Sequence, residues 1–133
     1  MSTPHQSINP WTWQDQFGFS QAVAAPAGSR WIVCAGQAAT DPDGGVVHVG
    51  DMRAQVGQAF DNLDTVLEKA GADLSHVVRL NYFTTDADAL LGAWDVVAER
   101  LGKAGIQPAR TFLGVARLAP DMLVEIEATA LVP

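Results

Sequence analysis

The chain has 133 residues, of which 48% are hydrophobic and 17% charged, and its formal net charge at pH 7 is −7. This composition excludes a disordered protein, and the length fits one domain, residues 1–133, with a core of its own. The acidic charge and the singly scattered Lys and Arg residues argue against nucleic-acid binding, which uses clustered cations. No apolar run approaches the roughly 20 residues of a membrane helix, so no membrane partner is expected.

The N-terminal residues 1–16 are polar and contain proline, and we predict that they form an arm lying on the domain. They lack the basic start and apolar segment of a secretion signal, and the lone Cys34 excludes an internal disulfide. A cytoplasmic protein is therefore expected. Short strands are predicted at 19–23 and 31–35, on either side of the turn-forming sequence APAGSR.

A turn at DPDGG, residues 41–45, precedes a brief predicted strand of valines at 46–49. Asp51 then has the position of a helix N-cap, and the helix is predicted to end at Gly71. Apolar residues recur along it at steps of three and four: Met52, Val56, Ala59, Phe60, Leu63, Val66, Leu67 and Ala70. This spacing is typical of an amphipathic helix. A strand is predicted at 77–84.

A second helix is predicted to begin with a capping box of Thr85 and Asp88 and to close near Gly105. Its apolar stripe comprises Leu90, Ala93, Trp94, Val97 and Leu101. Pro108 prevents continuation of the helix, and strands at 111–115 and 123–131 complete the chain. Two helices can cover only one face of a single sheet, so the pattern predicts an α+β fold whose other face needs a partner, such as further copies of the chain.

Alternation along the last two strands suggests which side chains share a face. Leu113 and Val115 suit the helix-covered core, which predicts that Arg110 and Phe112 face away from it. On the last strand Val124, Ile126 and Ala128 suit the core, and Glu125, Glu127 and Thr129 face away. If the two strands are neighbours, Arg110 meets one or two carboxylates on the helix-free face.

Two interpretations of this cluster are open from the residue types. Arg110 forms a structural ion pair with Glu125 or Glu127 on a solvated face, or it holds a small anion beside a carboxylate that orients water. Other candidates are weaker. Cys34 lies in an apolar strand and fits a core thiol. His5, His48 and His76 lack metal-ligand spacing, so no metal is expected. Neither a G-x-S-x-G motif nor a glycine-rich nucleotide loop is present.

Several stretches, in order and with matching spacing, carry a resemblance to a known family. They are FSQAV at 19–23, CAGQ at 34–37, DNLDTVLEKAGADLSHVVRL at 61–80, PART at 108–111 and VARLAPDMLVEIEATA at 115–130. From about Phe19 to Leu131 the chain resembles the Rid family, the YjgF-type reactive-intermediate deaminases.

The resemblance implies a chorismate-mutase-like α+β fold, in which one mixed sheet carries two helices on one face. It also implies a homotrimer with three clefts between subunits. The implied reaction is the hydrolysis of reactive 2-imino or enamine acids to 2-oxo acids and ammonia, as in 2-iminobutanoate/2-iminopropanoate deaminases. No metal or organic cofactor is implied, and the implied partners are a small 2-imino or 2-oxo acid and two further copies of the chain.

Carried over by position, Arg110 matches the family arginine that binds the substrate carboxylate, and Glu125 matches the residue that holds or activates water. Gly36 and the backbone of Phe112 match positions that border the site. These roles agree with the chemistry of a guanidinium fork and of a carboxylate bonded to water.

Three positions depart from the family pattern. Phe19 stands where tyrosine is frequent, Ala35 where serine is frequent and Phe112 where cysteine is frequent. These departures predict a narrower and more apolar site. The alternatives to a general imine deaminase are a trimer that binds small carboxylates without catalysis and a dedicated pathway deaminase on the same scaffold. Ribonuclease activity, also attached to the family, is least favoured because of the acidic charge.

Overall fold

The computed structural model describes residues 5–133, so the first four residues of the predicted arm lie outside the described part of the chain. The elements follow in this order: β1 (Gln6–Ile8), η1 (Trp13–Phe17), β2 (Ala22–Ala24), β3 (Arg30–Val33), α1 (Met52–Lys69), η2 (Leu74–His76), β4 (Val77–Thr84), α2 (Ala87–Gly92), α3 (Trp94–Ala104), β5 (Ala109–Gly114) and β6 (Val124–Val132).

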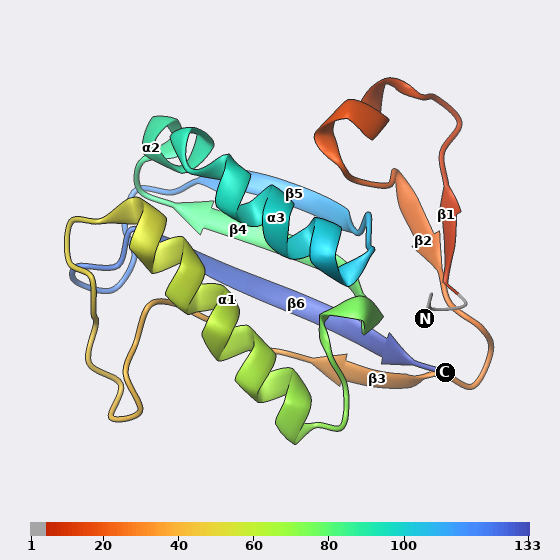
Figure 1. The fold of residues 1–133 in the computed structure, drawn as a ribbon, viewed down its shortest axis with the longest axis horizontal. Coiled ribbons are helices and arrows are strands. Elements are labelled where there is room, and N and C mark those ends of the chain that lie inside the picture. The colour runs from red at the N-terminus through yellow and green to blue at the C-terminus, as the bar shows by residue number, and fades with distance from the viewer. Residues whose placement is uncertain (1–4) are drawn as a thin grey trace.

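The main sheet has four strands in the order β3-β6-β4-β5. Strands β4 and β5 are parallel, and the pairs β3–β6 and β4–β6 are antiparallel, so the sheet is mixed. Helices α1 and α3 lie on the same face of it (Figure 1). The predicted α+β fold with a mixed sheet and helices is therefore confirmed. The prediction of a single sheet was incomplete, because β1 and β2 form a separate two-stranded sheet.

Helix α1 begins and ends where its sequence signals predicted. The Asp51 side chain accepts a hydrogen bond from the Ala54 amide at 3.0 Å, which satisfies one of the free N–H groups of the first turn. At the other end Gly71 has φ 78°, a left-handed conformation that glycine adopts without strain. The face of α1 that carries Val56, Phe60 and Leu63 is fully buried against the sheet. Each such side chain contributes roughly 1.5–3 kcal/mol by leaving water.

The second predicted helix is divided. Helices α2 and α3 meet at Ala93, and α3 ends at Gly105 in the left-handed conformation. The predicted cap at Thr85 was wrong by one residue. Asp86 is the N-cap of α2 because its carboxylate reaches the free Ala89 amide at 3.0 Å.

The predicted strand at 46–49 was wrong as well, since Val46 makes only an isolated bridge to Thr40. The carboxylate of Asp41 holds the preceding turn by accepting bonds at 2.9 Å from the amides of Asp43 and Gly45. His48 then has φ 57°, which interrupts an extended chain. The strand predicted at 77–84 is present with those bounds.

Among residues 5–133, no helix lies on the opposite face of the main sheet, as the prediction required (Figure 1). Trp31 and Val33 on β3 are 69% and 75% exposed, and Leu113 on β5 is 37% exposed. We call this surface of the four strands the open face. Large apolar side chains are thus exposed at both edges of this face, and Glu125, Glu127 and Asn81 lie on the two strands between them.

The N-terminal region folds back on the start of β5. Residues 9–21 connect β1 to β2, and we call this segment the arm loop. The Ser20 amide donates to the Pro108 carbonyl at 3.2 Å, and the Ser20 hydroxyl contacts the Gln107 carbonyl and donates to the Ser7 hydroxyl at 2.8 Å. His5 Nε2 donates to the Leu131 carbonyl at 2.8 Å. These contacts place the arm loop beside Arg110.

Candidate active site

Arg110 lies on the helix-covered face of the sheet, not on the open face. The parallel register pairs it with Leu80 on β4, and it pairs Phe112 with Tyr82. Leu80 and Tyr82 are fully buried under the helices, and paired residues on neighbouring strands share a face. The prediction that Arg110 and Phe112 face away from the helices was therefore wrong. It assumed that Leu113 is a core residue, whereas Leu113 is on the open face.

Aromatic rings surround the Arg110 guanidinium. Its Cζ atom lies 5.3 Å from the ring centre of Phe19 in the arm loop and 5.2 Å from that of Trp94 at the start of α3. One N–H group also donates to the Phe17 carbonyl. A cation between two π-faces is stabilised electrostatically, and the rings restrict the guanidinium to one orientation. The edges of the guanidinium remain the route by which an anion can bind.

Within residues 5–133, no Asp or Glu oxygen lies within 4.0 Å of the half-buried Arg110 guanidinium. The alternative that Arg110 is an ion-pair partner of Glu125 or Glu127 is thus wrong for this chain. The strand order explains this, because β4 lies between β5 and β6. Glu127 is instead bonded to Asn81, whose amide donates to it at 2.8 Å.

Glu125 lies on the open face, as predicted, opposite Phe83 of β4. Its side chain is held against the backbone of Gly36. A Cβ atom built on Gly36 would lie 2.7 Å from Glu125 Cδ and 2.8 Å from Cγ, distances that real Cβ atoms do not show. Glycine is thus required at position 36 while Glu125 occupies this place. The structure thus places Gly36 beside Glu125.

A β-bulge brings Gly36 to this position. The Cys34 amide donates to the Ala128 carbonyl at 2.9 Å, and Gln37 pairs with Ile126, so Ala35 and Gly36 together lie opposite Glu127. Such an extra residue bends the strand and redirects the chain. Ala35 is exposed at the bulge. Cys34 lies just before the bulge, opposite Ala128, and is buried in the core, which raises the pKa of its thiol.

The candidate residues thus form two groups within one chain. Phe19, Phe112 and Arg110 lie on the helix-covered side, and Ala35, Gly36 and Glu125 lie by the open face. The structure does not bring Arg110 and Glu125 of the same chain together, because the sheet separates them.

Sequence reasoning missed three residues around Arg110. Trp94 was assigned to packing, and Phe17 and Tyr82 were not considered. Tyr82 lies under Trp94, with ring centres 4.9 Å apart, and its buried hydroxyl has no hydrogen-bond partner among the described residues. Burial raises the pKa of Tyr82 to about 12, although the positive charge of Arg110 partly offsets the shift. No sequence signal links these residues, because they come from separate elements.

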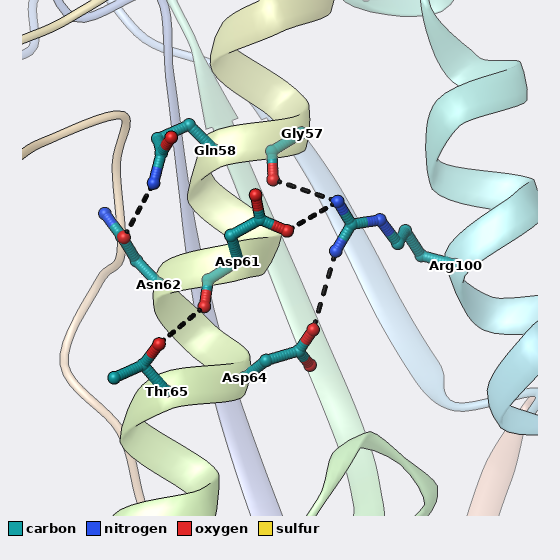
Figure 2. A network of polar contacts seen from close by, with 7 residues as sticks. All are labelled: Gly57, Gln58, Asp61, Asn62, Asp64, Thr65 and Arg100. Atoms are coloured by element: carbon teal, nitrogen blue, oxygen red, sulfur yellow. Dashed lines mark hydrogen bonds and ion pairs between the residues drawn. The ribbon is translucent and has the colours of Figure 1, made fainter.

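A second half-buried arginine shows the contrasting arrangement (Figure 2). Arg100 on α3 donates to Asp61 at 2.7 Å and to the Gly57 carbonyl at 3.3 Å, both on α1, and it lies 3.5 Å from Asp64. Burial raises the pKa of Asp64, and the Arg100 charge partly offsets this. Arg100 therefore has its carboxylate partners within the chain and serves to join the two helices.

Among the described residues, no group of three or more His, Cys, Asp or Glu side chains is placed to hold a metal ion, and no helix is long and apolar enough to cross a membrane.

The comparisons with known proteins agree with this fold. A family model described as endoribonuclease L-PSP matches residues 14–132. The crystal structure of YyfB from Yersinia pestis, a Rid-family protein described as of unknown function, aligns with a TM-score of 0.84 and 38% identity, covering 96% of this chain and 98% of that one. The chain belongs to the Rid/YjgF family.

Two relatives show the range of names within the Rid family. A RutC family protein of Pyrococcus horikoshii is 35% identical over 112 residues, which are 84% of this chain and 85% of the relative. A protein of Dermatophagoides farinae named 2-iminobutanoate/2-iminopropanoate deaminase is 31% identical over 114 residues, 86% of this chain and 85% of the relative. At this identity the deaminase name describes the relative, and it motivates the hypothesis below for this Rid protein.

Proposed function

We propose that this Rid protein hydrolyses 2-imino and enamine acids to 2-oxo acids and ammonia. The observation that carries the proposal is Arg110, a half-buried guanidinium held between two rings with no carboxylate partner in residues 5–133. Its planar fork matches the carboxylate that every such substrate carries. The deaminase relative supports the reaction class.

The site that we propose lies between two copies of the chain. Arg110 and Glu125 occupy opposite sides of their own sheet, so a substrate at Arg110 is served by Glu125 of a neighbouring copy. A homotrimer with three such clefts is the assembly that we propose. The exposed Trp31, Val33 and Leu113 side chains support it, because they offer an apolar surface for a second copy to cover.

The chemistry follows from these positions. Arg110 binds the substrate carboxylate and fixes the imine carbon in place. Glu125 of the neighbouring copy takes a proton from a water molecule as the water oxygen bonds to that carbon, and it passes this proton to the imine nitrogen, which gives a carbinolamine. The carbinolamine then expels ammonia as its oxygen forms the carbonyl of the 2-oxo acid. An enamine enters the same route once its C3 carbon is protonated.

A trapping assay tests the proposal. An amino-acid oxidase generates imines from a panel of amino acids, and semicarbazide captures the imine that survives. We expect the protein to lower the captured amount and Arg110→Ala to abolish this effect. Arg100→Ala is the matched control, because it removes a second half-buried arginine from outside the site. Equal activity of Arg110→Ala and wild type would exclude the proposed role of Arg110. If the protein hydrolyses no imine of the panel, the deaminase proposal fails and the alternative of a protein that binds carboxylates without catalysis is favoured.

A further inference from the structure

Arg110 lies within an array of aromatic rings that extends well beyond its two nearest partners. We call this array the aromatic box, and its members are Trp13, Phe17, Phe19, Tyr82, Trp94 and Phe112. On one side of Arg110 the rings of the arm loop form edge-to-face contacts, with Trp13 at 5.8 Å from Phe19 and 6.5 Å from Phe17. On the other side the ring of Trp94 lies 5.7 Å from that of Phe112.

The two sides of the box differ in exposure. Tyr82 is fully buried, and Trp94 and Phe112 pack on the hydrophobic core, so this side is a fixed support. In the arm loop, by contrast, Trp13 is 53% exposed and Phe17 is 54% exposed. Two large rings thus stand at the outer end of the array, linked to Arg110 through the Phe19 ring and the Phe17 carbonyl, with much of their surface in water, where a ligand bound to Arg110 can cover them.

The side chains of the box favour apolar ligands. The three phenylalanines of the box have no hydrogen-bonding atoms in their side chains, and the Tyr82 hydroxyl is buried. The indole N–H groups of Trp13 and Trp94 are therefore the polar atoms that the box offers to a substituent. An aryl group, however, would gain edge-to-face contacts with the exposed rings, and its removal from water would also favour binding. A methyl group is too small to make these contacts.

From this arrangement we infer that the aromatic box selects ligands with an aromatic side chain. The inferred substrates are 2-imino acids derived from aromatic amino acids, whose carboxylate binds Arg110 while the aryl ring lies against Trp13 and Phe17. This inference rests on the proposed function for the reaction, but the selectivity for an aryl group follows from the box alone and is testable without turnover.

Binding of 2-oxo acids, measured by titration calorimetry, tests the selectivity for an aryl group separately from the hydrolysis of imines. We expect phenylpyruvate to bind at least about tenfold more tightly than pyruvate to the wild-type protein, because a preformed apolar site discriminates by size. Trp13→Ala should bring this ratio towards one. Trp11→Ala is the matched control, since Trp11 is a neighbouring tryptophan that is 57% exposed and makes no ring contact with the box.

Each result has a distinct meaning. Equal affinity for the two oxo acids, or equal effects of Trp13→Ala and Trp11→Ala, would overturn the inference whatever the trapping assay shows. Selective binding of phenylpyruvate that depends on Trp13 supports it even if no imine is hydrolysed, in which case the proposed function alone fails. In the trapping assay, the same preference is expected as at least roughly tenfold faster removal of the phenylalanine-derived imine than of the alanine-derived imine.

Discussion

Arg100 and Arg110 are both half-buried, and both lie near an aromatic ring, yet their surroundings differ in one respect. Arg100 is satisfied by the carboxylates of α1 (Figure 2), whereas Arg110 has aromatic rings and one backbone carbonyl but no carboxylate within the described chain. The first arrangement balances the charge and joins two helices. The second leaves a positive charge available to a ligand. Burial alone therefore does not distinguish a structural arginine from a binding one, but the charge partner does.

The strongest test of this comparison mixes two inactive variants. Arg110→Ala and Glu125→Gln should each lower the rate of imine hydrolysis at least about 100-fold. If Arg110 and Glu125 act across an interface, subunit exchange between the variants creates some sites with both native residues. Random mixing in equal amounts should restore about a quarter of the wild-type activity. An inactive mixture, with subunit exchange verified by mass spectrometry, would contradict the two-copy site.

Tyr82 sharpens the comparison through its position beside Arg110. Burial raises the pKa of Tyr82 to about 12 in the folded protein, whereas a tyrosine in an unfolded chain has a pKa of about 10. The folded protein keeps its full stability below pH 10 and loses stability as the pH rises towards 12, because in that range the unfolded chain gives up the tyrosine proton more readily. The loss should amount to roughly 2–3 kcal/mol of unfolding free energy. Denaturant titrations of wild type and Tyr82→Phe at pH 8 to 11.5 measure it. A constant difference between the two proteins across this range would rule out the raised pKa.

Gly36→Ala tests the carboxylate side of the site. The added methyl group must displace the Glu125 side chain, which should lower the hydrolysis rate about tenfold and change stability less. Gly57→Ala serves as a control, because a Cβ atom at that helical glycine meets no atom within 4 Å. Full activity of Gly36→Ala would show that the position of Glu125 against Gly36 is not needed.

Arg100→Ala should have the smallest effect. Its carboxylate partners are about half exposed, so we expect a loss of about 1 kcal/mol in unfolding free energy and no loss of hydrolysis. The pKa of Asp64 should rise further once the Arg100 charge is gone, which NMR titration can follow. A large drop in activity with the fold intact would mean that Arg100 is not the structural counterpart that the comparison requires.

The sequence predicted regular elements better than it predicted the site. The periodicity of α1 and the apolar residues of β4 identified both elements, because each buries one face along its length and is bounded by clear caps or turns. Strand β5 was assigned to the wrong orientation because it is an edge strand that carries apolar residues on both faces. Phe112 packs on the core and Leu113 does not, a difference that residue type cannot reveal.

The site depended on features that alternation does not encode. Strand β4 lies between β5 and β6 in the sheet, so Arg110 and Glu125 are not on neighbouring strands and do not form an ion pair. The residue pattern within each strand does not reveal this strand order. The aromatic partners of Arg110 come from the arm loop and from α3, so only the folded chain brings them together. The family resemblance assigned Gly36 and Glu125 to the same site, but it did not say that they are neighbours, and that contact is seen only in the folded chain.

The contacts of the arm loop also set an order of events during synthesis. Ser20 bonds to Pro108, Phe17 contacts Arg110 and His5 bonds to Leu131, so each of these contacts joins segments that are far apart in the sequence. Residues 5–20 must therefore remain without their final partners until β5 and β6 have been translated. The surroundings of Arg110 are thus completed late in folding, after the strand that carries Arg110 has joined the sheet.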